Sequence, residues 1–584
     1  MGDTLSNGIM CREEKQQGVL FHPSFFSGIK KRYRSLLLLA LVIIVFFIPI
    51  FRLLMLSFTS ETAITVEHYA RVLSEQKTWK VISNTVIIAC GSTVLSLVLG
   101  VCMAWLVAYS DIRGKKLMQI FILLPFIIPS YIITLSWTQF MGTNGLAIKL
   151  LAVFSGDLKP WNIYSYGGMI LIMGISHYPL VYMLTVSVFR KISRDMELAA
   201  RMSGVNRVQA FYHITLPLAL PGIASGGLLA FLASLDNFGI PAFLGIPARI
   251  SVLSTMIYEE IIGYGPSAFA RGAALSVILG IIALIGTLFQ WWLLRRYKRF
   301  ETVKEDYAPR FSFARHRIYI EVMVWIFLIT ISIIPVFSMA MTSLVNAYGM
   351  DFTPVNLTFR HYHFILAESQ KTKNAIQNSL ILGMVTTMLC LLIGTIIAYY
   401  RTRKVSPISK AVEIFVGLPY ALPGMVLALA MIFTWMEPVP GWNPGIYGTI
   451  KILIIAYITR FMILQVRGSI TAMMQVDRSM EEAARACGAK TASTWKKVLI
   501  PLLLPGMMSG AFMVLLSSLT ELTLSSILWS SGCETIGLTI FNFEQAGYIT
   551  YSTAFSTFVV LLIMIGGLAF YLFRKFWKKR VMHI

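Results

Sequence analysis

Two carboxylates stand inside otherwise apolar stretches of this sequence, Asp236 in SLDNFGIPAFLG and Glu521 in SLTELTLSSILW. An ionisable side chain at the centre of a membrane-spanning helix costs about 2.5–3.5 kcal/mol on insertion scales, so it usually faces a cavity or a partner. Two such carboxylates brought together would suit a hard, highly charged cation, which prefers oxygen ligands. The alternative is a structural role, in which they hydrogen-bond across helices or pair with Arg460. Asp236, Glu521 and their neighbours Asn237 and Thr520 are therefore candidate residues of a polar path through a membrane.

Three other polar side chains in apolar sequence could line the same path: Tyr131, His177 and Tyr178. A single histidine or tyrosine in a helix bundle more often packs or hydrogen-bonds between helices than binds a solute. The eight histidines and six cysteines of the chain are scattered, and the cysteines form no C-x-x-C pair. Neither a catalytic cluster nor a fixed metal site is therefore indicated.

Two polar segments resemble one another, MELAARMSG at 196–204 and MEEAARACG at 480–488. Glutamate and alanine favour a helix, and glycine is preferred just after a helix end. A second short helix and then a P-x-x-x-P-G sequence, at 217–222 and 501–506, follow each segment. The alanines leave a smooth face for a close fit against another protein, with an arginine beside it for carboxylate pairing. The alternative is an amphipathic helix at the lipid headgroups, which two copies at the same spacing disfavour.

The elements that must position these residues are membrane-spanning helices. Of the 584 residues, 57% are hydrophobic and 13% are charged, and the mean hydropathy is +0.72, whereas a soluble chain carries about 25% charged residues. The net charge of +23 fits the basic loops of a membrane protein, so no nucleic-acid partner is expected. Apolar runs of about 20 residues predict twelve spans, at 36–58, 84–109, 117–139, 168–189, 218–246, 272–294, 319–343, 378–400, 411–436, 447–466, 502–530 and 553–574. The fifth and eleventh contain Pro, Gly and an acidic residue, so each is expected to tilt or break.

Lysine and arginine indicate the orientation of these spans. With the N-terminus in the cytoplasm, the inside segments hold 37 of the 50 Lys and Arg residues, and the outside segments hold 10. This bias is typical of the positive-inside pattern, so both termini are predicted to face the cytoplasm.

The sequence also contains an internal repeat. An offset of 294 residues takes Asn84 to Asn378, and an offset of 284 takes Gly204 to Gly488. Because such matches keep their order and separation, the predicted fold is an all-α polytopic membrane protein of twelve transmembrane helices in two parallel six-helix repeats. Its predicted parts are a cytoplasmic N-terminal segment (1–35), a first repeat (36–294), a cytoplasmic linker (295–318), a second repeat (319–574) and a basic cytoplasmic tail (575–584).

The pattern E-A-A-x-x-x-G followed by L-P-x-x-x-P-G resembles the coupling-loop signature of type I ABC importer permeases. The second copy has the pattern complete, whereas the first has Leu198 where the second has Glu482. The resemblance implies that each loop docks into a cleft of a cytoplasmic ATPase and transmits ATP-driven closure to the helices. The residues that it assigns to this coupling are Glu197, Ala199, Ala200, Arg201 and Gly204 in the first loop and Glu481, Glu482, Ala483, Ala484, Arg485 and Gly488 in the second.

The chain contains no G-x-x-x-x-G-K-[ST] sequence, so ATP hydrolysis is expected in a separate subunit. The resemblance implies two copies of a P-loop ATPase, which binds the ATP and Mg²⁺, and no cofactor in this chain. It also implies an extracytoplasmic substrate-binding protein and, for this chain, a multi-pass location among the lipids of a bacterial inner membrane.

The stretches around Pro129, Asp236 and Glu521 are similar to the ferric-iron group of these permeases. This similarity implies Fe(III) as the substrate, with transient contact at the two carboxylates. Importers of the same class for 2-aminoethylphosphonate, sugar phosphate, thiamine, polyamine or molybdate remain alternatives. A gradient-driven secondary transporter would also show parallel repeats, but it would not need two cytoplasmic E-A-A-x-x-x-G loops.

Overall fold

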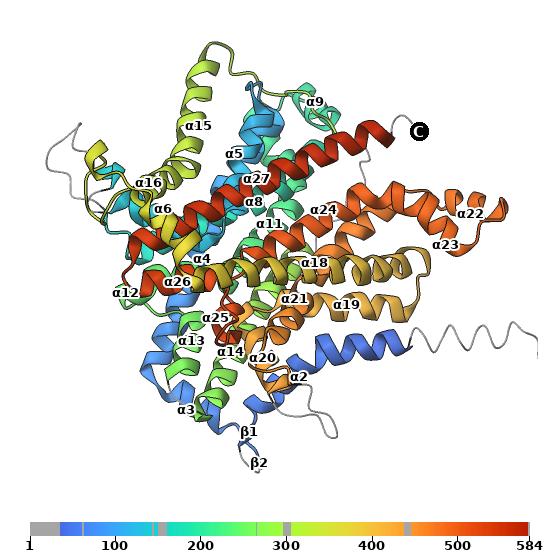
Figure 1. The fold of residues 1–584 in the computed structure, drawn as a ribbon. Coiled ribbons are helices and arrows are strands. Elements are labelled where there is room, and N and C mark those ends of the chain that lie inside the picture. Colours follow the sequence, from blue (N-terminus) through green and yellow to red (C-terminus); the bar gives the residue numbers. More distant parts are fainter. Residues whose placement is uncertain are drawn as a thin grey trace, which may run out of the picture.

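The computed structural model describes residues 36–60, 63–142, 145–149, 161–263, 266–295, 305–436 and 445–581. The predicted N-terminal segment 1–35, the linker residues 296–304 and the last three residues of the tail lie outside the described residues. The described chain is almost entirely helical, as predicted, apart from one two-residue hairpin (Figure 1).

The first half of the chain contains the hairpin and the first set of helices (Figure 1). Its elements are η1 (Ile43–Phe47), α2 (Ile48–Ser57), β1 (Thr59–Ser60), β2 (Ala63–Ile64), α3 (Glu67–Ser74), α4 (Gln76–Tyr109), α5 (Lys115–Ile127), α6 (Ser130–Met141), α8 (Tyr166–Lys191), α9 (Arg194–Met202), α10 (Arg207–Ala210), η2 (Phe211–Thr215), α11 (Leu216–Asp236), η3 (Pro241–Gly245), α12 (Ile246–Ala248), α13 (Leu253–Gly263) and α14 (Pro266–Leu294).

The second half follows a similar order of long and short helices. Its elements are η4 (Ala314–His316), α15 (Arg317–Ser332), α16 (Ile334–Ser343), η5 (Pro354–Asn356), α17 (Arg360–His363), η6 (Phe364–Glu368), α18 (Gln370–Arg403), α19 (Pro407–Ala421), α20 (Gly424–Trp435), α21 (Ile450–Met474), α22 (Arg478–Ala486), α23 (Thr491–Thr494), η7 (Trp495–Leu499), α24 (Ile500–Leu519), α25 (Ser525–Leu528), α26 (Ile536–Gln545) and α27 (Ile549–Val581).

Within the described residues, nine helices are long and apolar enough to cross a membrane, or up to twelve if three bent helix pairs each count as one span. The bends correct two predicted spans, 117–139 and 411–436. The helices α5 and α6 meet at a bend of 100°, and α19 and α20 at a bend of 111°. Both breaks fall where a residue precedes a proline, Pro129 or Pro423, because that residue is restricted to extended backbone.

The predicted breaks in the fifth and eleventh spans are present. The helix α11 ends at Asp236, and the chain continues into a third bent pair, at 78°, formed by residues 241–248 and 253–263. The helix α24 ends at Leu519, and the short helix α25 follows. Both carboxylates of interest therefore stand at the ends of long helices.

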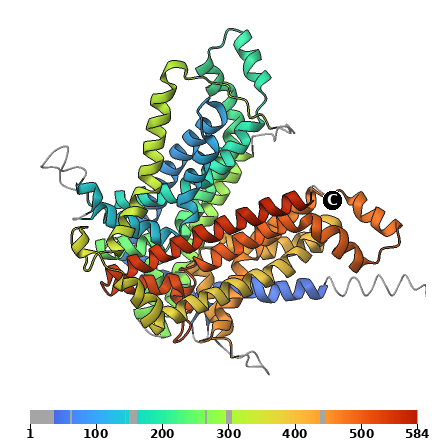
Figure 2. The ribbon, with the colours of Figure 1, turned by 45° about the horizontal axis from the view of Figure 1, so that its top comes forward.

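The long helices form two bundles that diverge from a shared base, and Figure 2 shows α9 and α22 at the far ends of the two bundles. The first span of each half packs against the other half. The helix α2 contacts α20 of the second half as well as α14 of its own, and α16 contacts α6 of the first half as well as α27 of its own. Val42 and Phe46, in the first span, accordingly belong to a hydrophobic core made mostly by the second half. The first span of each half thus packs against helices of the other half.

Matching asparagines hold matching turns in the two halves. The Asn84 side chain donates a hydrogen bond to the carbonyl oxygen of Ser251, at 2.9 Å. The Asn378 side chain donates to the carbonyl oxygens of Gly532 and Glu534, at 2.9 and 3.0 Å. Each bond ties the start of a long helix, α4 or α18, to the loop that precedes α13 or α26.

Candidate coupling helices and candidate translocation path

The two polar segments form the short helices α9 and α22, which begin with side-chain caps. The Ser193 hydroxyl accepts a hydrogen bond from the backbone N–H of Asp195, and the Asp477 carboxylate accepts one from Ser479. Such a cap satisfies one of the free N–H groups in the first turn of a helix. The bond from Ser479 also holds the pKa of the Asp477 carboxyl below its usual value.

Both helices end at the predicted glycines. Gly204 has a φ of 88° and Gly488 a φ of 81°, in the left-handed region that favours glycine. The backbone N–H of the next residue, Val205 or Ala489, donates to the carbonyl oxygen of Ala200 or Ala484. This six-to-one bond is the Schellman arrangement, so the two helix ends have the same geometry.

Each helix exposes one alanine of its pair and half-buries the other. Ala199 and Ala483 are exposed, and Ala200 and Ala484 are intermediate. The two arginines assigned to coupling, Arg201 and Arg485, are also exposed, as are Leu198 and Glu482, the position at which the first loop departs from the E-A-A-x-x-x-G pattern. The exposed face of each helix thus contains the first alanine of the pattern and the position of this departure.

The first glutamate of the second loop points into its own chain. The Glu481 side chain is 3% exposed, and its carboxylate accepts a hydrogen bond from Arg403 Nε at 2.7 Å. It also accepts one from the Tyr399 hydroxyl at 3.3 Å and one from Arg485 at 3.4 Å. Glu481 therefore anchors α22 to the end of α18.

The corresponding glutamate of the first loop, Glu197, is held by different residues. Its carboxylate accepts hydrogen bonds from the Thr215 hydroxyl at 2.8 Å and from Arg310 Nη1 at 3.2 Å. This anchor borders a cavity of about 590 Å³ that Trp105 and Phe211 help to line. The corresponding rings of the second half, Tyr399 and Trp495, lie 4.9 Å apart.

Sequence reasoning assigned Glu197 and Glu481 to contact with a partner and missed the arginines that hold them. Arg403 could have been suggested by its place in RTRK, directly after an apolar run. Arg310 lies in the linker and carries no local signal that relates it to Glu197. The coupling role of the two segments stays a prediction. In the structure, Glu197 and Glu481 bond to arginines of the same chain, and Ala199 and Ala483 are exposed.

The two adjacent glutamates of the second loop are expected to respond differently to substitution. Glu481→Gln removes the charge that Arg403 pairs with, and charged hydrogen bonds contribute about 1.5–3 kcal/mol, so amide hydrogen exchange in α22 should accelerate by about ten-fold or more. Among the described residues Glu482 pairs with Arg478 alone, and both side chains are more than half exposed. Glu482→Leu, which copies the first loop, should therefore change the exchange rate by no more than a few-fold. Equal acceleration in both variants would contradict this assignment.

The candidate path residue Asp236 forms an ion pair between the two halves. Its Oδ2 atom lies 2.5 Å from Arg460 Nη2, and its Oδ1 atom accepts a hydrogen bond of 2.5 Å from the backbone N–H of Gly424. Arg460 is buried in α21. The structure therefore contains the Arg460 pairing given as the structural alternative for Asp236.

Glu521 lies within electrostatic range of the same arginine but is bonded locally. The Glu521 carboxylate accepts hydrogen bonds from the backbone N–H groups of Leu524, at 2.7 Å, and Ser525, at 3.0 Å. These bonds satisfy the start of α25. Asp236 and Arg460 thus form the charged contact between the halves, whereas the Glu521 carboxylate is held within its own half.

The other candidate residues separate into two places. Tyr131 is buried beside Phe243 in an aromatic cluster that Phe541 of the second half completes. His177 and Tyr178 are buried within the first bundle, and a His177 ring nitrogen lies 3.0 Å from the Ser234 hydroxyl.

The two neighbours of the carboxylates make local bonds. Asn237 accepts a hydrogen bond from the backbone N–H of Ile240 at 2.9 Å, and Thr520 donates one to the carbonyl oxygen of Leu516 at 2.9 Å. Both side chains are half-buried.

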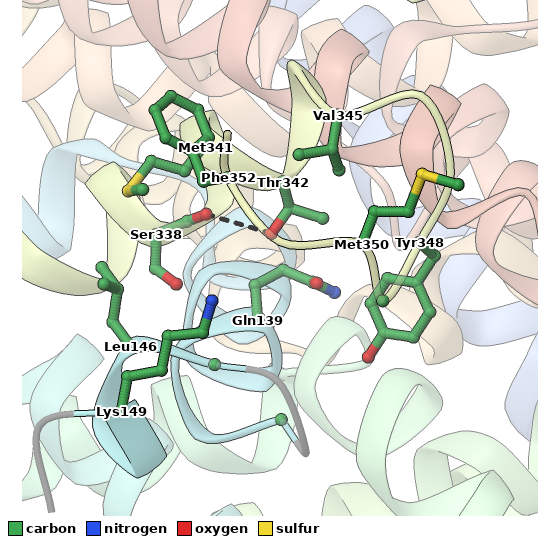
Figure 3. A pocket seen from close by; sticks show the side chains of 13 residues that line it. Gln139, Leu146, Lys149, Ser338, Met341, Thr342, Val345, Tyr348, Met350 and Phe352 are labelled. Carbon is green, nitrogen blue, oxygen red and sulfur yellow. Dashed lines mark hydrogen bonds between the residues drawn. The ribbon is translucent and has the colours of Figure 1, made fainter. Parts of the chain in front are cut away.

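A small cavity lies at the base of the molecule, between the end of α6 and the loop after α16 (Figure 3). Its volume is about 50 Å³, and Gln139, Thr342 and Tyr348 help to line it. Lys149, which also lines the cavity, pairs with Asp351 at 2.8 Å, and this hydrogen bond holds the pKa of the Asp351 carboxyl below its usual value. A cavity of this size holds little more than a few water molecules. Among the described residues, no three His, Cys, Asp or Glu side chains come together as a metal-binding group.

The sequence matches a family described as binding-protein-dependent transport system inner membrane component, over residues 96–299 and again over 390–583. It is 25% identical to the ferric transport system permease protein FbpB of Actinobacillus pleuropneumoniae, over 90% of this chain and 76% of that protein. It is 20% identical to an Fe(3+)-transport system permease protein of Haemophilus influenzae, over 92% and 98% of the two chains. It is also 28% identical to the molybdenum transport system permease protein ModB of Escherichia coli, over 37% of this chain and 93% of that protein.

Among solved structures, a bacterial ABC transporter that imports the acidic polysaccharide alginate aligns with 47% of this chain and 99% of its own. The alignment has a TM-score of 0.39 and a sequence identity of 17%.

Proposed function

The chain belongs to the family of binding-protein-dependent transport system inner membrane components, which matches both of its halves, and from this premise we propose how it works. It is an ABC importer permease, a multi-pass protein of the inner membrane. We propose that it forms the whole membrane pathway of an ATP-driven importer, with two copies of a cytoplasmic ATPase seated on α9 and α22. An extracytoplasmic binding protein delivers the substrate.

One observation carries the coupling proposal: each bundle ends in a helix with a side-chain cap at its start, a glutamate bonded to an arginine of the same chain, and a glycine at positive φ at its end. The helices α9 and α22 lie at the divergent ends of the bundles (Figure 2). A partner that brings these ends together would close the bundles around the path between them. An anchored glutamate would make each helix move with its bundle, because the anchor ties α22 to α18.

We propose a membrane arrangement of twelve spans in two parallel repeats, with the sequence bounds 36–294 and 319–574 and with both termini and the linker in the cytoplasm. The described residues offer up to twelve candidate spans if each bent pair counts as one, but that set includes the pair 241–263 and omits α21. The proposed six-and-six division therefore rests on the sequence repeat, with α21 counted as a span and the pair 241–263 not counted. The matching asparagine bonds and the exchanged first spans support the repeat. The bias in Lys and Arg supports the orientation.

The proposed path runs between the bundles and is shut at their base. Two kinds of contact join the halves there. One is the Asp236–Arg460 ion pair. The other is the packing of Phe541 against Phe238 and Phe243, with ring centres 5.7 and 5.6 Å apart. Divergence toward α9 and α22 makes this arrangement open to the cytoplasm under the proposed orientation. Transport would require the base to part while the other ends close.

We propose ferric iron as the substrate, because relatives that match 85–92% of this chain are named as ferric transport permeases. The two carboxylates at the base, Asp236 and Glu521, would meet a hard cation with oxygen ligands in passing. Pairing with Arg460 neutralises Asp236, which suits brief contact with a cation rather than a stable site.

Uptake into proteoliposomes tests the proposal. The chain would be reconstituted with a P-loop ATPase and a soluble binding protein, and uptake of radioactive ferric iron would be measured with ATP and with a non-hydrolysable analogue. We expect uptake only with ATP, and we expect that molybdate and 2-aminoethylphosphonate are not taken up. Uptake that follows an ion gradient without the ATPase would contradict the importer, and uptake of an oxyanion instead of iron would contradict the substrate.

A further inference from the structure

The two coupling helices are anchored by arginines from unrelated parts of the chain. In the second half, Arg403 closes the last turn of α18 and bonds Glu481. The offset of 294 residues places Tyr109, not an arginine, at the matching position of the first half. The arginine that bonds Glu197 is Arg310, from the segment that joins the two halves.

The two arginines bond equivalent acceptors. Arg403 Nη2 donates to the carbonyl oxygen of Val476 at 2.6 Å, and Arg310 Nη2 donates to that of Ile192 at 2.5 Å. The offset of 284 residues that pairs Glu197 with Glu481 also pairs Ile192 with Val476. Each guanidinium therefore joins the coupling glutamate to the residue at the end of the preceding long helix.

The linker is docked so that Arg310 reaches this place. The backbone N–H groups of Arg310 and Phe311 donate to the carbonyl oxygen of Tyr109 at 2.8 and 2.9 Å. The Arg310 guanidinium lies 4.7 Å from the centre of the Tyr109 ring, and Arg310 Nη1 donates to the Tyr109 hydroxyl at 3.2 Å. The Arg310 side chain is 6% exposed.

Contacts on both sides of Arg310 hold the same segment. The backbone N–H of Asp306 donates to the carbonyl oxygen of Arg190 at 2.8 Å. The Ser312 hydroxyl donates to Asp111 at 2.6 Å, and this bond holds the pKa of the Asp111 carboxyl below its usual value. The segment thus lies along the loop that follows α4 and the end of α8, next to α9.

We propose that Arg310 is a positioning residue for coupling, supplied by the linker to the first coupling helix in the role that Arg403 has at the second. The inference rests on the proposed coupling function. The linker is then a working part of the first loop as well as a connection between the halves. Because the first half has Tyr109 where the second half has Arg403, the guanidinium that bonds Glu197 comes from the linker instead.

The test transplants the arrangement of the second half into the first. Arg310→Ala should leave Glu197 without its guanidinium and accelerate amide hydrogen exchange in α9 by about ten-fold or more. Arg310→Ala combined with Tyr109→Arg should restore slow exchange, because the new guanidinium starts from the position that Arg403 occupies. Arg315→Ala, an exposed arginine of the same linker, is the matched control and should change nothing.

The same variants are then assayed in the ATPase complex. Arg310→Ala should lower uptake per ATP hydrolysed by about ten-fold, Arg310→Lys should lower it less, and the double variant should recover it. Unchanged exchange in Arg310→Ala would overturn the proposal. So would a double variant that stays fast in exchange or fails to accumulate in the membrane. Exchange is measured on the chain alone, so its result holds even if the wild-type complex couples no ATP hydrolysis to uptake, the result that would refute the proposed function.

Discussion

Arg460→Met is expected to abolish coupled uptake and to leave the ATPase active without the binding protein. The Arg460 guanidinium lies 2.5 Å from Asp236 across the contact between the halves. Removing one partner of a fully buried ion pair costs about 3–5 kcal/mol because the other charge stays unpaired. The cost here is smaller, since the Asp236 side chain is 34% exposed and water screens its charge. The closed base would lose that stabilisation, so the contact between the halves would open without the binding protein.

The reversed pair Asp236→Arg with Arg460→Asp provides the internal check. It should recover part of the binding-protein dependence, because the attraction across the contact is restored while the Gly424 bond to Asp236 is not. Arg467→Met, at an exposed position of the same helix α21, should have no effect on either measurement. Normal uptake by Arg460→Met would show that the pair does not keep the base closed.

Valine in place of Gly204 or Gly488 is expected to uncouple ATP hydrolysis from uptake, lowering uptake per ATP by about ten-fold or more at either loop, since a side chain at positive φ costs about 1–2 kcal/mol and a β-branched one costs more. A Cβ added at either position would meet nothing within 4 Å. The cost therefore comes from the backbone alone, and the helix end would shift to relieve it.

An asparagine at the same positions separates two explanations. Asparagine tolerates the left-handed region, so Gly488→Asn should keep most of the coupling if only the backbone conformation matters. If the glycine also lies against the ATPase surface, asparagine should fail as valine does. Gly547→Val is the control, because Gly547 has a φ of 78° and an equally open surrounding in a loop far along the chain. A loss of coupling with Gly547→Val would mean that general destabilisation explains the result.

Local signals in the sequence predicted the parts of this molecule that local chemistry decides. The helix ends at Gly204 and Gly488 and the breaks after Asp236 and Leu519 follow from glycine, proline and acidic residues in apolar sequence. The bends at Pro129 and Pro423 carried a similar signal, but the hydropathy pattern continues through them.

Long-range pairing could not be predicted in the same way. Apolar helices carry little information about which neighbour they choose, so the exchange of the first spans was not foreseen. The inward turn of Glu197 depends on Arg310, which is 113 residues away in the chain. The pairing of Asp236 with Arg460 was one of two alternatives, because charge complementarity alone does not give distance.

The exchange of the first spans has a consequence for the fusion of the two halves into one polypeptide. Each half contacts the other through its first span, which includes α2 in the first half and α16 in the second. Non-covalent contacts therefore hold the two halves together in addition to the covalent join. The segment that carries Arg310 directly precedes α15 of the second half, and Arg310 bonds Glu197 in the coupling helix of the first half. This segment would therefore have to be kept if the two halves were separated. A gene split before that stretch would yield two subunits, one of which completes the other.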